Sequence, residues 1–131
     1  MADYEQSRIV DGRASDIYDY LADPGHLTGY VATMVKAQVV AADHLHVAAD
    51  ISRGHEEGEA MFRADASARR LEWGGLPDHG YHGWLAVADG DSADTSTVTI
   101  HLATRDDADH DEIERAIAQT LDNIGTILTS A

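Results

Sequence analysis

The sequence predicts one α+β domain, in which an antiparallel sheet is closed by a long C-terminal helix. Three observations predict it. Apolar residues recur with a period of two through much of the stretch from Lys36 to Thr104. A helical period then runs to Leu128. Short turns separate the strand-like stretches, which makes consecutive strands antiparallel and separates sheet from helix.

The N-terminal part predicts one strand followed by two short helices. Tyr4 to Val10 is an extended segment that ends at Asp11-Gly12. Ser15-Asp16 supplies an N-cap and a first-turn acid for a helix. Asp23-Pro24-Gly25 ends that helix, because the residue before a proline avoids the α region. His26 to Val31 is predicted as a second short helix or turn.

The middle of the chain predicts a run of strands joined by turns. Segments 36–40 and 45–51 are expected as one long strand or a hairpin, with a bend or bulge at 42–44. The other expected strands are 59–64, 70–74, 81–88 and 96–104, with turns that include 53–58, 65–69, 75–78 and 89–94. The last strand has the clearest alternation: Val98, Ile100 and Leu102 point one way, and threonines and His101 point the other. We therefore expect one face of this strand to be buried.

The C-terminal segment carries the strongest helical pattern. The acids of 106–112 lie where a helix N-terminus exposes unpaired N–H groups and partial positive charge. An apolar stripe follows at helical spacing, formed by Ile113, Ala116, Ile117, Leu121, Ile124 and Leu128. Such a stripe predicts burial against the sheet.

Size and charge limit the classes of function. The 131 residues fit a single domain, taken here as 1–131. A net charge of −15 disfavours nucleic acid and anionic membranes as partners. No stretch is apolar enough for membrane insertion, and there is no cysteine, so we expect a cytoplasmic protein without disulfides or thiolate sites. Genome composition, salt adaptation or a basic partner would each account for the charge.

Three stretches resemble the START-like helix-grip superfamily (SRPBCC), and within it the polyketide cyclase/dehydrase and lipid-transport branch. Ile9 to Asp23 is similar to its opening strand and first helix, Thr97 to Ile100 to its last strand, and Ile117 to Leu128 to its closing helix. The resemblance implies a deep apolar cavity between sheet and closing helix. Members bind lipids, sterols, polyketides or aromatic compounds, some are cyclases, and some activate chaperones. The iron site of the oxygenase branch has no counterpart here.

A cluster after the predicted loop at 75–78 offers catalytic candidates. His79, His82 and Tyr81 could supply a base, an acid or a group that polarises a carbonyl, as an aldol-type cyclisation requires. The alternative is that these histidines are exposed loop and outer-face residues of a histidine-rich acidic protein.

Aromatic and apolar residues on the predicted strands and helices are candidates for lining the cavity. The predicted ligand-pocket residues are Tyr18, Tyr30, Phe62, Trp73, Trp84, Ile100, Leu121 and Ile124. The alternative is that the tryptophans simply fill the core.

No metal or cofactor is expected. His79 and His82 would point to opposite faces of a strand, since side chains alternate. His44 and His46 would share a face but lack a third ligand. The acidic stretch 89–94 does not match a calcium-binding loop.

Two further features have both a ligand-related and a structural interpretation. Arg63 and Glu72, on neighbouring predicted strands, would form an internal anchor for a polar ligand group or a cross-strand pair on the surface. Gly125 in the closing helix would leave room for a ligand or be a tolerated helix residue.

These observations favour a module that binds a small hydrophobic molecule, such as a lipid, a polyketide or an aromatic compound. The first alternative is a polyketide cyclase/dehydrase-type enzyme that uses histidine and tyrosine. The second is a protein-interaction or chaperone-activating module. Homodimer formation is left open by the sequence.

Overall fold

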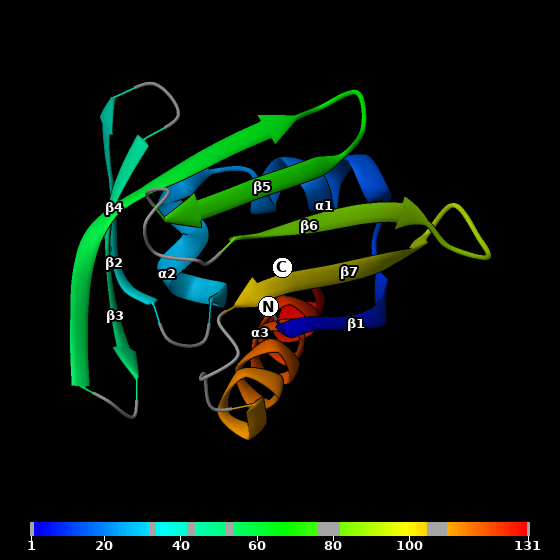
Figure 1. The fold of residues 1–131 in the computed structure, drawn as a ribbon. Helices are drawn as coiled ribbons and strands as arrows, with labels where there is room; N and C mark the ends of the chain where they lie inside the picture. Colours follow the sequence, from blue (N-terminus) through cyan, green and yellow to red (C-terminus); the bar gives the residue numbers. More distant parts are fainter. Residues whose placement is uncertain are drawn as a thin grey trace.

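The computed structural model describes residues 2–31, 34–41, 44–51, 54–75, 82–104 and 110–130. Its elements are β1 (Ala2–Asp11), α1 (Ala14–Leu21), η1 (Pro24–His26), α2 (Leu27–Tyr30), β2 (Met34–Ala41), β3 (His44–Ile51), β4 (Gly54–Asp65), β5 (Arg70–Gly75), β6 (His82–Asp89), β7 (Thr95–Thr104) and α3 (His110–Ser130). The strands form one antiparallel sheet in the order β1-β7-β6-β5-β4-β3-β2, with α3 packed against it (Figure 1). This confirms the predicted helix-grip layout with two short helices after the first strand.

Strand β7 lies between β1 and β6 and sorts its side chains as its alternation predicts. Val98, Ile100 and Leu102 are buried on the face that meets the helices, called here the inner face. Thr99 and His101 point to the outer face and are only partly buried. β-Branched residues suit a half-buried pleated surface, so local preference and burial agree in this strand.

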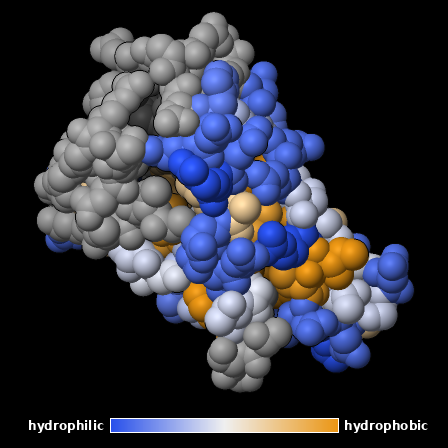
Figure 2. Space-filling view, turned by 90° about the horizontal axis from the view of Figure 1, so that it is seen from below, coloured by the Kyte–Doolittle hydropathy of each residue, from blue (hydrophilic) through white to orange (hydrophobic). Residues whose placement is uncertain are grey.

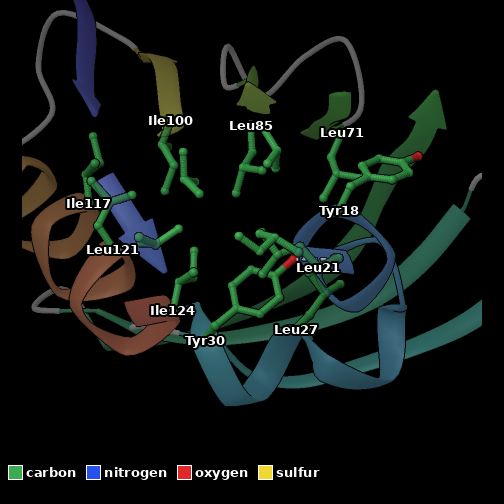
Figure 3. Close-up of a cluster of buried hydrophobic side chains, with 14 of the residues drawn as sticks. Tyr18, Leu21, Leu27, Tyr30, Leu71, Leu85, Ile100, Ile117, Leu121 and Ile124 are labelled. Carbon is green, nitrogen blue, oxygen red and sulfur yellow. Dashed lines mark hydrogen bonds between the residues drawn. The ribbon is translucent and has the colours of Figure 1, made fainter. Parts of the chain in front are cut away.

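Helix α3 closes the inner face. Ile117, Leu121 and Ile124 are at most 2% exposed and lie opposite Ile100 and Leu85 of the sheet (Figure 3). Two polar contacts tie the helix to β1 as well. The Gln6 side-chain amide donates to the Glu114 carbonyl at 3.0 Å, and Arg8 forms an ion pair with Asp122.

The short helices are joined to each other and to α3. Tyr30 is 2% exposed, and its hydroxyl donates to the carbonyl of Leu21 at the end of α1 at 2.7 Å. The Asn123 side-chain amide of α3 donates to the Tyr30 carbonyl at 3.1 Å. A single tyrosine therefore links three helices through one hydroxyl and one carbonyl.

The predicted start of α1 is wrong by two residues. Arg13 is the N-cap and makes no side-chain capping hydrogen bond, and Ser15 is an exposed residue inside the helix. The helix starts two residues early because hydrogen bonds from a distant part of the chain hold the turn before it. Gly12, with φ 132°, donates to the Asp94 carbonyl at 2.7 Å and accepts from the Ser96 hydroxyl at 2.7 Å.

The predicted turn over Arg53 to Gly58 is also wrong from Gly54 onward. Strand β4 begins at Gly54, which pairs with Ile51 of β3, and the pairing continues to Met61. Glycine and charged residues have low strand preference, so the sequence pattern indicates a turn there. The ladder of hydrogen bonds to β3 overrides that local preference.

Replacing the Tyr30 hydroxyl tests the link between the helices. At neutral pH, Tyr30→Phe should lower the free energy of unfolding by about 1 kcal/mol, because a buried hydrogen bond is lost. Burial, and to a smaller extent Tyr20, raises the pKa of the Tyr30 phenol. The unfolded chain therefore releases this proton first, and the wild-type stability falls as pH rises above about 10.

Tyr30→Phe has no phenolic proton to lose, so its free energy of unfolding does not fall in this way. In alkaline solution it should first approach that of the wild type and then exceed it. Urea unfolding of both proteins from neutral to alkaline pH measures this. A deficit that stays constant across that range would contradict the buried position of the phenol.

Candidate functional site

One row of paired positions crosses the inner face from β4 to β1. In order it consists of Phe62, Trp73, Gly83, Leu102 and Tyr4, each the register partner of the next. Paired residues of an antiparallel sheet share a face. Three of the five are aromatic, so we call this set the aromatic row.

The aromatic row borders the sealed part of the core. In the next row inward, Leu71, Leu85 and Ile100 are at most 3% exposed and lie beneath the helices (Figure 3). In the aromatic row, Trp73 is only partly buried, although it packs against the same core. Apolar residues also appear between hydrophilic ones on the side seen from below (Figure 2). The row therefore offers ring surface at the margin of the core.

Gly83 allows this row to pack closely. A Cβ atom at this position would lie 2.6 Å from the Leu102 Cδ2, 2.6 Å from the His101 carbonyl oxygen and 3.0 Å from the Trp73 Cε2. The Trp73 indole therefore lies against the β6 backbone where a side chain would otherwise stand. Glycine within a strand commonly marks such a close approach.

A polar pair stands at the β1 end of the aromatic row. The Tyr4 hydroxyl is in hydrogen-bonding contact with Nδ1 of His110, the first residue of α3, and the ring centroids are 5.5 Å apart. Tyr4 is 8% exposed and His110 is exposed. A phenol and an imidazole can each donate or accept a proton. The pair escaped sequence reasoning because its members are 106 positions apart.

The predicted ligand-pocket residues fall into four places. Ile100, Leu121 and Ile124 meet between the sheet and α3, while Phe62 and Trp73 lie on the inner face in or against the same core (Figure 3). Tyr30 is buried and holds Leu21, as described above. Tyr18 is 5% exposed, and its hydroxyl points away from α3 (Figure 3). Burial, with smaller effects from Asp65 and Asp19, raises the pKa of Tyr18. Trp84 lies on the outer face, opposite Glu72 and His101.

The predicted catalytic cluster is only partly described. His79 and Tyr81 lie outside the described residues. His82 is exposed on the outer face, where its register partner is Gly74. The structure therefore places His82 on the side of the sheet that faces away from α3.

Arg63 and Glu72 lie on the outer face of the sheet. These residues are register partners, but the Glu72 carboxylate forms its ion pair with Arg70, at 3.1 Å from Nε. The Arg70 guanidinium lies 4.5 Å from the ring centre of Trp84. Arg63 and Glu72 are therefore a cross-strand pair on the surface, as the second alternative predicts, although the ion pair of Glu72 is made with Arg70.

The described residues contain no group of three or more His, Asp or Glu side chains placed to hold a metal ion. None of the helices in the described part is long and apolar enough to cross a membrane.

No protein-family profile matches the chain, and no curated protein matches it. Solved structures do match it along nearly its whole length. An aromatase/cyclase from a Streptomyces species has a TM-score of 0.78 at 13% identity, covering 94% of this chain and 90% of that one. A START superfamily protein from Mycobacterium smegmatis has a TM-score of 0.73 at 11% identity, covering 96% and 93%. The chain has the START-like helix-grip fold.

One match is to a longer chain. The di-domain aromatase/cyclase StfQ from the steffimycin biosynthetic pathway has a TM-score of 0.77 at 16% identity, and the match covers 94% of this chain but 44% of StfQ. This chain therefore spans less than half of StfQ. In the START-like fold described here, the aromatic row lies on the inner face of the sheet, and its β1 end reaches the first residue of α3.

Two glycine substitutions test the packing of the site in opposite directions. Gly83→Ala should lower the free energy of unfolding by about 1–3 kcal/mol, because the new methyl group overlaps backbone and side-chain atoms. Gly125→Ala should raise it by up to about 1 kcal/mol, because its Cβ would meet no atom within 4 Å and alanine favours the helix. Urea unfolding measures both. A Gly83→Ala protein as stable as wild type would contradict the close packing of Trp73 on β6.

Proposed function

We propose that the chain binds a small, mainly apolar molecule between the inner face of the sheet and α3. The observation that carries this proposal is the aromatic row, in which a partly buried tryptophan lies beside a fully sealed core. Ligand sites are typically apolar, with aromatic walls and few polar groups.

The chemistry of the row defines a class of ligand. The rings of Phe62, Trp73 and Tyr4 suit the flat or extended apolar surface of an aromatic compound, a polyketide or a lipid. The Tyr4–His110 pair at one end suits a single carbonyl or hydroxyl group on that ligand. The solved relatives that are aromatase/cyclases support a ligand of this kind.

The two tryptophans provide a matched test, because they lie on opposite faces. Trp73→Leu should weaken the binding of 1,8-dihydroxyanthraquinone by about tenfold, since a large aromatic contact is lost. Trp84→Leu, which removes an indole from the outer face, should leave this affinity unchanged. Native mass spectrometry of the three proteins with the anthraquinone measures the binding, and thermal unfolding shows that each variant is folded. Equal weakening by both substitutions, or no binding by the wild type, would count against the proposal.

A second candidate function is catalysis of the aromatase/cyclase type, and the Tyr4–His110 pair favours it. The imidazole would accept the proton next to a substrate carbonyl, and the phenol would donate a hydrogen bond to the carbonyl oxygen. The Tyr4–His110 pair takes the role that the sequence assigned to His79, His82 and Tyr81. A ligand bound along the aromatic row would reach Tyr4, which is buried at the end of the row. It would also reach His110, which is exposed and in contact with Tyr4.

The enzyme hypothesis predicts a large effect at the pair. With 1-phenylhexane-1,3,5-trione as the substrate, His110→Gln should slow cyclisation by about a hundredfold or more, the usual contribution of a general base. Tyr4→Phe should slow it less, since the ring remains. His82→Gln is the control and should have no effect. Product formation followed by chromatography gives the rates, and equal rates for wild type and His110→Gln would exclude the pair from the mechanism.

A further inference from the structure

The face of the sheet that points away from α3 is hollowed. The hollow has a volume of about 460 Å³, within the range of small-molecule sites. Its lining includes Met61, Arg63, Glu72, Gly74, His82 and Trp84. These residues come from β4, β5 and β6.

The sheet register explains the hollow. Met61, Gly74 and His82 are successive register partners on the outer face. Gly74 is buried at the floor of the hollow and has no side chain, so no side chain fills the row between Met61 and His82. The next row, with Arg63, Glu72 and Trp84, forms one wall of the opening.

That wall contains a fixed aromatic surface. The Trp84 and His101 rings are stacked, with centroids 5.4 Å apart and planes within 7°. The Arg70 guanidinium lies over the Trp84 ring and is paired with Glu72. Trp84 is thus held from two sides.

Arg63 gives the hollow an available positive charge. Its side chain is exposed, and it has no ion pair or hydrogen bond with any described residue. Its register partner Glu72 is already paired with Arg70. Met61 beside it is 43% exposed and supplies apolar surface. Arg63 is thus a guanidinium without a partner among the described residues, in a chain whose net charge is −15.

We propose that this hollow is a second small-molecule site, which binds a planar aromatic carboxylate. The guanidinium of Arg63 holds the carboxylate through paired N–H donors, as arginine commonly does. The ring system lies over Gly74, between Met61 and Trp84. Trp73 and Gly83 of the aromatic row also border the hollow, while their register places their side-chain positions on the inner face. The second site is therefore tested with its own probe and its own variant.

The test uses 2-naphthoate as the probe and a charge-matched control. Arg63→Gln should weaken its binding by about tenfold, because a charge-assisted hydrogen bond to the carboxylate is lost. Arg115→Gln removes the same charge from an exposed position on α3 and should leave the affinity unchanged. The neutral analogue 2-naphthalenemethanol should bind the wild type about as weakly as 2-naphthoate binds Arg63→Gln. Isothermal titration calorimetry gives the affinities.

The position of the probe is measured separately. Intermolecular NOEs from bound 2-naphthoate to the Met61 methyl group are expected, and none to Leu102 on the inner face. NOEs to Leu102 alone would overturn the second site and place the probe at the aromatic row. Absence of binding, or equal loss in Arg63→Gln and Arg115→Gln, would also overturn it.

Discussion

The unbroken register of β1, β7, β6 and β5 is the constraint on which the rest of the structure depends. Side chains alternate along a strand, so a fixed register assigns every residue of these strands to one face or the other. It brings Trp73, Leu102 and Tyr4 into one row on the inner face, and it places Trp84 and His101 together on the opposite side. A slip of one residue would exchange the two faces.

Helix α3 packs on the inner face that this register defines. Its apolar stripe covers the inner rows around Leu85 and Ile100, and its first residue, His110, reaches Tyr4 at the edge of the sheet. The helix therefore seals the core and supplies the polar group beside the aromatic row. None of the described helices covers the hollow of the outer face, where an ion pair and ring stacking hold the side chains in place. Arg70 and His101 hold Trp84, while Arg63 is without a described partner.

The sequence predicted the fold class well where local pattern and tertiary packing agree. The alternation of β7 and the apolar stripe of α3 are clear because each has a polar and an apolar side. The strand around Trp84 has no such contrast, since Trp84, Leu85, Ala86 and Val87 are all apolar. Only the pairing with β5 and β7 decides that Leu85 faces inward and Trp84 outward.

The sequence pattern also did not predict the long-range contacts, because these depend on tertiary pairing. Nothing near Tyr4 or His110 indicates that they meet, because their contact depends on the whole path of the chain. The choice of Arg70 over Arg63 as the partner of Glu72 is likewise set by side-chain geometry on the folded sheet.

The two faces of the sheet are separate, and the proposed apolar ligand binds at the inner one. The indole N–H signals of Trp73 and Trp84 report on these faces separately in a ¹H–¹⁵N NMR titration with 1,8-dihydroxyanthraquinone. The signal of Trp73 should shift and saturate, while that of Trp84 stays in place. A saturating shift of Trp84 alone, or no shift of either signal, would contradict the account.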